Sequence, residues 1–287
     1  MKPKISAALV YDFDGTLASG DCIEHGLFGA LDVTRSEDFW DEVRDRKERE
    51  DADEILSYMQ VLAEKAAAKD ATLLSPEKLQ EFGQSIPLFA GLETWFKRIN
   101  DFARERGLHL EHYIVSSGLK EMIRGCRIAQ HFKHIYASQY MQSGGGLYCP
   151  SVAINYTTKT QYLFRINKGI YNNWDNDATN QWMAYDKRPM PFERMIYLGD
   201  GDTDIPSMKM VAQKGGQSIA VFDPKKWEQQ KHKAKISSLI AEKRVNFVAP
   251  GDFTEGELLD IIIRGIVGRY ARDIGYPGTA DNSLGAV

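Results

Sequence analysis

The sequence is poor in three features that would narrow its class: cysteine, long apolar runs and net charge. Three widely spaced cysteines, an odd number among 287 residues, do not suit a disulfide framework, and reduced thiols of a cytoplasmic protein are the simpler expectation. No stretch approaches the roughly 18 to 20 apolar residues of a membrane span, and the N-terminal apolar run is too short for a signal peptide. A net charge of −4 gives no electrostatic reason to expect nucleic acid or a membrane as partner. The oligomeric state stays open.

Residues 21–87 are predicted to form an entirely helical segment. Apolar residues recur there at helical spacing at Ile55, Met59, Leu62 and Ala66. Ser36 precedes a further apolar stripe in the manner of an N-cap, and Ser75-Pro76 has the cap-then-proline form that opens a helix. The charge-dense run Asp41–Glu54 is typical of a solvated helix face rather than a partner-binding patch.

Strand and helix patterns alternate on both sides of that segment. The apolar run Ile5–Tyr11 suits a buried strand, and Tyr113–Val115 forms a second one before Ser116. Later strands are expected around Ile135–Tyr136, Met195–Leu198, Ser218–Phe222 and Phe247–Val248. The alternation predicts an α/β fold with a doubly wound parallel sheet. The core then covers residues 1–20 and 88–272, with 21–87 inserted after the first strand and a flexible tail at 273–287.

Two stretches fit the alternating pattern less well. Ser138–Tyr156 contains three successive glycines and is predicted to form a β-hairpin or flap. Asn167–Pro191 is rich in Asn, Asp and Trp and is predicted to be a long irregular connection. Whether this connection borders a site, binds a partner or only packs is left open.

The most informative residues are Asp12-Phe13-Asp14-Gly15-Thr16, directly after the first strand. Two carboxylates one residue apart repel each other unless a cation or a substrate compensates them. Open α/β sheets bind their ligands at this carboxyl edge. An ordinary Asp- and Gly-rich turn is the alternative, but the position after a hydrophobic strand favours a functional site.

A second acidic loop, Gly199-Asp200-Gly201-Asp202-Thr203-Asp204, follows another buried strand. A calcium loop is excluded because Ile205 and Val211 stand where such a loop needs Gly and Glu. Carboxylates that arrive from two strand ends suit Mg²⁺, which binds a few hard oxygen ligands and keeps water for itself and a phosphate.

The order of these motifs resembles the haloacid dehalogenase (HAD) superfamily. Its four motifs match Asp12–Thr16, Ser116, Lys159 and Gly199–Asp204, in this order. The resemblance covers roughly residues 1–20 and 88–250 and implies a Rossmann-like core, with residues 21–87 as a C1-type cap. The chain looks most similar to phosphoserine-phosphatase-like members, although Asp21 stands where that branch carries Glu.

The resemblance also implies a role for each matched residue. Asp12 is the nucleophile that forms an aspartyl phosphate, and Asp14 is the general acid and base. Mg²⁺ is held by Asp12, by the Asp14 backbone carbonyl, by Asp200 and, directly or through water, by Asp204. The phosphate is bound by Thr16, Ser116, Ser117 and Lys159. Ser116 is favoured over Ser117 because the strand is expected to end at Val115. Lys159 is favoured over Lys168 because a helix-like segment follows Lys159. Asp202 is expected to be a loop residue without a metal bond.

The function expected from this set is Mg²⁺-dependent hydrolysis of a small phosphorylated metabolite. Dehalogenation is disfavoured because true dehalogenases of the superfamily lack the acid/base aspartate that Asp14 supplies. A phosphomutase acting on a sugar phosphate is the close rival, since an aspartyl phosphate can return its phosphoryl group to a sugar. A catalytically idle binding protein is the alternative from another class, although no essential acid is missing.

A basic insert residue such as Arg44, Arg46 or Arg49 could meet a substrate carboxylate, but exposed helix arginines are the simpler interpretation.

Overall fold

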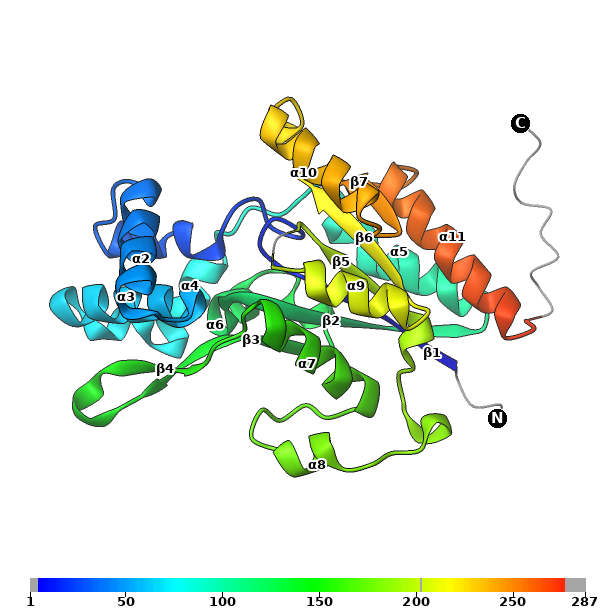
Figure 1. Ribbon diagram of the computed structural model, residues 1–287, viewed down its shortest axis with the longest axis horizontal. Helices are drawn as coiled ribbons and strands as arrows, with labels where there is room; N and C mark the ends of the chain where they lie inside the picture. Colours follow the sequence, from blue (N-terminus) through cyan, green and yellow to red (C-terminus); the bar gives the residue numbers. More distant parts are fainter. Residues whose placement is uncertain (1–4, 202, 277–287) are drawn as a thin grey trace.

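The computed structural model describes residues 5–201 and 203–276, which form a sheet of seven strands covered by helices (Figure 1). The strand order is β4-β3-β2-β1-β5-β6-β7. All neighbours are parallel except β3 and β4. The bounds are β1 Ile5–Tyr11, β2 Leu108–Leu119, β3 His134–Gln142, β4 Tyr148–Val152, β5 Met195–Gly199, β6 Gln217–Phe222 and β7 Phe247–Pro250. The predicted doubly wound α/β fold is confirmed, and the chain order reverses between β1 and β5, the point where such sheets bind ligands.

Helices cover both faces of the sheet. The side chains of β1 alternate between these faces and so contribute to a core on each side. Leu9 and Tyr11 belong to one core cluster with residues of α5 and α11, whereas Val10 belongs to another with residues of α7 and α9. The helices outside residues 21–87 are α5 Leu92–Arg104, α6 Lys120–Gly125, α7 Tyr156–Lys168, α8 Asn176–Asn180, α9 Ile205–Gln213, α10 Gln230–Ala241 and α11 Leu258–Asp273. The short 3-10 helices there are η3 Ala129–His131, η4 Gly144–Gly146, η5 Tyr185–Lys187, η6 Phe192–Arg194 and η7 Pro224–Lys226. In the described part of the chain, no helix combines the length and apolar character needed to cross a membrane.

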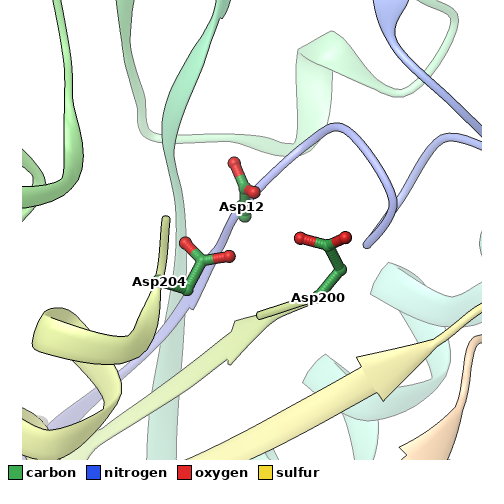
Figure 2. A group of neighbouring side chains, drawn as sticks. All are labelled: Asp12, Asp200 and Asp204. Atoms are coloured by element: carbon green, nitrogen blue, oxygen red, sulfur yellow. The ribbon is translucent and has the colours of Figure 1, made fainter. Parts of the chain in front are cut away.

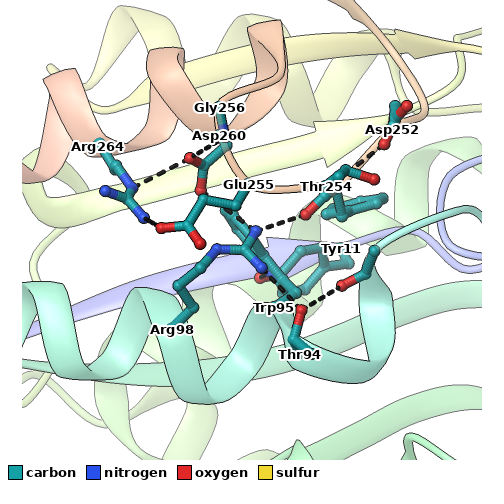
Figure 3. Close-up of polar contacts among 12 residues, drawn as sticks. Tyr11, Thr94, Trp95, Arg98, Asp252, Thr254, Glu255, Gly256, Asp260 and Arg264 are labelled. Carbon is teal, nitrogen blue, oxygen red and sulfur yellow. Dashed lines mark hydrogen bonds and ion pairs between the residues drawn. The ribbon is translucent and has the colours of Figure 1, made fainter.

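A buried polar network fixes the side of β1 that faces α5 and α11 (Figure 3). The Trp95 indole N–H donates to the Tyr11 hydroxyl at 3.0 Å, which reaches Nδ1 of His112 at 3.0 Å. Arg98 joins α5 to α11 through the Phe253 carbonyl at 2.6 Å and Asp260 at 3.4 Å. Because Tyr11 directly precedes Asp12, this network holds the strand end that carries the first acidic motif.

The helical insert, residues 21–87, contains no strand and lies at one end of the molecule (Figure 1). Its elements are η1 Cys22–Glu24, α1 Leu27–Ala30, α2 Ser36–Glu50, α3 Glu54–Lys69, η2 Ala71–Leu74 and α4 Pro76–Gly83. Its two connections to the core run side by side, with Ser19 N–H donating to the Pro87 carbonyl at 3.1 Å and Phe89 N–H to the Leu17 carbonyl at 2.9 Å. Gly83 allows α4 to approach α6 closely, since a Cβ there would lie 2.0 Å from the Met122 carbonyl oxygen.

The predicted caps of the insert are confirmed at one helix and corrected at another. Ser75 accepts a hydrogen bond from the Lys78 amide as the N-cap of α4. Ser36 is instead the first residue of α2, whose N-cap is Arg35. The Ser36 hydroxyl donates to the Glu24 carboxylate, so the side chain that could cap the helix ties it to η1.

Other boundaries are also corrected by the structure. The hairpin predicted in Ser138–Tyr156 is present as β3 and β4, and Asn167–Pro191 is irregular except for short helices. β2 does not end at Val115 but continues through a register shift to Leu119. Residues 273–276 of the expected tail belong to the folded structure, because α11 runs to Asp273 and the Tyr276 amide donates to the Ala271 carbonyl at 3.1 Å. Residues 277–287 lie outside the described residues.

Candidate active site

Three carboxylates meet at the carboxyl ends of β1 and β5. Asp12 follows β1, Asp200 follows β5, and Asp204 is the N-cap of α9. Parallel pairing of Tyr11 with Leu198 sets the two strand ends level, and the Asp12 amide donates to the Leu198 carbonyl at 2.8 Å. One oxygen of each carboxylate lies within 4.8 Å of the others, and Figure 2 shows the three groups facing a common space. The structure thus brings together the two acidic motifs that lie far apart in the sequence.

Lys159 provides the cation at this cluster. It lies in the first turns of α7, whose start is fixed by a capping box at Asn155. Its fully buried ammonium group is 3.0 Å from Asp12 Oδ1 and 2.7 Å from Asp204 Oδ1, and it donates to the Thr203 hydroxyl at 3.1 Å. Burial opposes the charge, but the two carboxylates outweigh burial and raise the pKa of Lys159 above its ordinary value. Lys159 therefore stays positive.

Lys168, the competing candidate, lies at the other end of α7. Its ammonium group donates to the carbonyls of Thr179 at 2.6 Å and Gln181 at 2.7 Å. It holds the irregular connection in place and does not reach the carboxylates.

The acidic cluster has the donors that a divalent cation needs. Burial, followed by the charge of Asp204, raises the pKa of Asp12 well above its ordinary range. Asp204 uses Oδ1 for Lys159 and for the Tyr197 hydroxyl at 2.6 Å, while its buried Oδ2 has no hydrogen-bond partner among the described residues. The three carboxylates converge on one small volume, so a hard cation would reduce their mutual repulsion and give the orphaned oxygen a partner. The residues present therefore fit a hard divalent cation.

Asp14 is held apart from the three clustered carboxylates. Its Oδ1 accepts the Cys22 backbone N–H at 2.7 Å, which links it to the first turn of the insert. Burial, reinforced by the charge of Asp21, raises the pKa of Asp14 to about 8. A raised pKa favours the protonated carboxyl, which is the form that can act as an acid. Gly15, the residue after Asp14, has a φ of +70° and lies against the Asp200 side chain. A Cβ at this position would be 2.7 Å from Asp200 Oδ2, so glycine is required here.

The two adjacent serines of β2 differ in the state of their hydroxyl groups. Ser116 accepts a hydrogen bond from the Gly118 amide at 3.0 Å. The buried Ser117 hydroxyl has no partner in the described part of the chain, and Ser117 lines the cavity. Because β2 continues past Val115, the reason for favouring Ser116 does not hold. Thr16 is fully buried, and its hydroxyl likewise finds no partner among the described residues.

A cavity of about 320 Å³ lies over this site. Its floor includes Asp12, Asp14 and Asp200, one wall comes from the insert, and another comes from η7 and α10. Trp40 and Tyr58 belong to the insert wall, and the Tyr58 hydroxyl donates to the Ser117 carbonyl at 2.6 Å.

Several residues of this site have no individual signal in the sequence. Thr203 stands inside the second acidic motif, so its position could have suggested a role. Tyr197, Tyr58 and the α10 residues become neighbours of the site only through the fold. Asp202 lies outside the described residues, so its prediction stays untested.

Within the described chain, neither the arginines of the insert nor the connection Asn167–Pro191 lines the cavity. The insert arginines form ion pairs on helix surfaces: Arg44 with Asp41, Arg46 with Glu64 and Arg49 with Glu50. No residue of Asn167–Pro191 lines the cavity either. Instead, the buried Arg165 of α7 donates to carbonyls of that connection at Asn172 and Asn173.

The chain matches the model of a known protein family. Residues 9–209 match the family described as haloacid dehalogenase-like hydrolase. The chain belongs to this family. The HAD hydrolase is thus an enzyme, and the match spans both acidic motifs, the insert and Lys159.

Individual relatives are distant. The HAD hydrolase is 25% identical over 279 residues to an uncharacterized protein of Borreliella burgdorferi, covering 88% of this chain and 93% of the other. A HAD family hydrolase from Salmonella enterica serovar Typhi superimposes with a TM-score of 0.57 at 13% identity, covering 92% of this chain and 72% of the other. A probable phosphoserine phosphatase from Vibrio cholerae superimposes with a TM-score of 0.57 at 15% identity, covering 94% of this chain and 67% of the other. A substrate-bound phosphoserine phosphatase superimposes with a TM-score of 0.50 at 18% identity, covering 90% of this chain and 97% of the other. These likenesses show the shared fold.

Proposed function

We propose that this HAD hydrolase is a Mg²⁺-dependent phosphatase that hydrolyses a small phosphomonoester through an aspartyl phosphate on Asp12. The observation that carries the proposal is the buried group formed by Asp12, Lys159, Asp200 and Asp204 beneath the cavity. Asp12 and Asp200, the Asp14 backbone carbonyl and Asp204, directly or through water, would hold the metal. When bound, Mg²⁺ supplies positive charge that reduces the repulsion between a carboxylate nucleophile and a phosphate dianion.

The first half-reaction uses Asp12 and Asp14. A carboxylate oxygen of Asp12 forms a bond to phosphorus as the bond between phosphorus and the ester oxygen breaks. The protonated Asp14 carboxyl gives its proton to the departing oxygen, which leaves as an alcohol. Lys159 and the Ser117 hydroxyl are placed to offset charge on the phosphoryl oxygens.

The second half-reaction returns the enzyme to its starting state. Water attacks phosphorus, the bond from phosphorus to Asp12 breaks, and the Asp14 carboxylate takes the proton that the water loses. The products are inorganic phosphate, a free Asp12 carboxylate and a protonated Asp14.

The cavity supports a compact substrate. A volume of about 320 Å³ lies at the lower end of the range of small-molecule sites, and the helical insert would act as a cap that limits water at the reacting phosphorus. We propose that the protein works on a small metabolite in the cytoplasm, without nucleic acid or membrane.

Phosphate release from a panel of phosphorylated metabolites tests this function. The protein with MgCl₂ is expected to release phosphate from several of them without an activating bisphosphate, whereas Asp12→Asn is expected to be inactive with an unchanged circular dichroism spectrum. Isomerised sugar phosphate without phosphate release would identify a mutase instead. An Asp12→Asn variant as active as the parent would contradict the proposed nucleophile.

A further inference from the structure

The walls of the cavity carry opposite charges. The insert contributes Asp21 and Glu54 to the lining, while η7 and α10 contribute Lys226, His232 and Lys235. α10 follows β6 and extends beyond the carboxyl end of that strand (Figure 1). The basic side chains therefore enter from the core, opposite the insert.

The element that forms the basic wall is rich in positive charge. Residues 224–241 contain five lysines and one glutamate, in a protein whose net charge is −4. That glutamate, Glu228, forms an ion pair with Lys233 at 3.1 Å. Asp223 lines the cavity too, but its carboxylate accepts the Lys225 amide at 2.9 Å as the cap of η7. The acids on this element are thus engaged locally.

Two of the lining groups are available for a ligand. Within the described chain, the side chains of Lys226 and His232 form neither a hydrogen bond nor an ion pair, and His232 is partly buried. Lys235 extends the basic wall to the floor, because a Cβ at Gly201 would lie 2.5 Å from Lys235 Nζ. Basic side chains therefore line this wall of the cavity from the loop at Asp200 through α10 to η7.

We infer that η7 and α10 form a subsite for a second anionic group, so that the preferred substrates are phosphomonoesters of small alcohols that also carry a carboxylate or another phosphate. The inference rests on the proposed phosphatase function. With the ester phosphate above Asp12, an anion on the leaving group extends toward Lys226 and His232. A neutral leaving group would leave both side chains without a partner, and a purely cationic one would meet like charge on this wall. The subsite acts on binding of the leaving group and takes no part in the bond changes at phosphorus.

Matched substrates test the charge requirement. 3-Phosphoglycerate and glycerol 3-phosphate share the phosphate and the carbon chain, but the first has a carboxylate where the second has a hydroxymethyl group. Propane-1,3-diol bisphosphate and its monophosphate form a second pair in which the added anion is a phosphate. In at least one pair, the member that carries the added anion is expected to have the higher kcat/KM, by about tenfold, which is the typical contribution of a charge-assisted hydrogen bond. The two pairs distinguish a carboxylate from a phosphate subsite.

Variants locate the subsite. Lys226→Gln combined with His232→Gln is expected to raise KM for the preferred substrate about tenfold, with kcat nearly unchanged and with kcat/KM for glycerol 3-phosphate unaltered. Lys231→Gln is the control, since it removes a lysine charge from α10, directly beside His232, at a residue that does not line the cavity.

Two results would overturn the inference: equal kcat/KM within both substrate pairs, or a double variant that weakens charged and neutral substrates alike. The second result would mean that Lys226 only balances Asp21, which lies within reach of its charge. Calorimetric binding of the same compounds to Asp12→Asn tests the subsite without turnover. Preference for the added anion there supports the subsite even where no phosphate is released by the parent, an outcome that would contradict the proposed function alone.

Discussion

The ammonium group of Lys159 lies 3.0 Å from Oδ1 of Asp12, and both side chains are buried. This contact joins the first and third motifs of the sequence and sets the electrostatics of the candidate nucleophile. The same ammonium group also reaches Asp204 at 2.7 Å, so one lysine organises the acids from both strand ends.

Replacing Lys159 is expected to affect activity far more than replacing Lys168. Lys159→Ala removes the cation beside Asp12 and is expected to lower kcat about 10²- to 10³-fold, the size of effect seen when an electrostatic donor is removed. Lys168→Ala only releases contacts with the Thr179 and Gln181 carbonyls and is expected to keep most activity. Steady-state phosphate release measures the activity of both variants. A larger loss in Lys168→Ala than in Lys159→Ala would assign the third motif to Lys168.

Asp14 is expected to matter most when the leaving group is poor. Asp14→Asn removes the acid that protonates the ester oxygen, so hydrolysis of an alkyl phosphate is expected to fall about 10²- to 10⁴-fold. Formation of the aspartyl phosphate from p-nitrophenyl phosphate, whose leaving group needs no proton, is expected to slow much less. Rapid-quench measurement of the first turnover compares the two substrates, and an equal loss for both would argue against Asp14 as the acid.

Mg²⁺ is expected to stabilise the folded protein. Asp12, Asp200 and Asp204 repel one another at close range, and a cation that binds only the folded state raises the free energy of unfolding by mass action. The Tm should therefore rise with MgCl₂, return after EDTA, and respond less in Asp200→Asn. A Tm that is the same with and without MgCl₂ would count against the metal site.

His112 is expected to make stability fall in acid. Burial, aided by the charges of His131 and His109, lowers the pKa of His112 to about 3, while its ring nitrogens contact the Tyr11 hydroxyl and the Asn100 side-chain oxygen. Between an ordinary pKa near 6.5 and this value the unfolded chain binds a proton that the folded chain excludes, so stability is lost as pH falls through that range.

The contribution of His112 can be separated by a matched variant. Over the range from about pH 6 to pH 4, the free energy of unfolding of His112→Gln should depend less on pH than that of the parent, by about 1.4 kcal/mol per pH unit. Identical slopes in parent and His112→Gln would contradict a neutral buried His112.

The sequence predicts those parts of the structure whose signals are local. Hydrophobic period and turn residues predict the strand that ends at Tyr11, the helical insert, and the hairpin of β3 and β4. The end of β2 was missed because the apolar run stops at Val115, whereas the strand continues through a register shift to Leu119.

What the sequence could not supply is proximity between distant segments. A lysine-rich helix such as α10 is ordinarily a solvated surface, and nothing in its own residues indicates that His232 lines a cavity above Asp12. Tyr197 similarly looks like a core residue of β5, yet its hydroxyl donates to Asp204. These contacts depend on the register of the sheet and on where the crossover helices pack.

The central claim is that Asp12 carries the phosphoryl group during turnover. The most direct test is mass spectrometry of protein quenched in acid during turnover of p-nitrophenyl phosphate with MgCl₂, followed by reduction of the acyl phosphate with borohydride to mark the residue. One phosphoryl group is expected on the intact protein, with the mark on Asp12, and neither is expected in Asp12→Asn. A phosphoryl group on another residue, or phosphate release with no phosphorylated protein at any quench time, would contradict it.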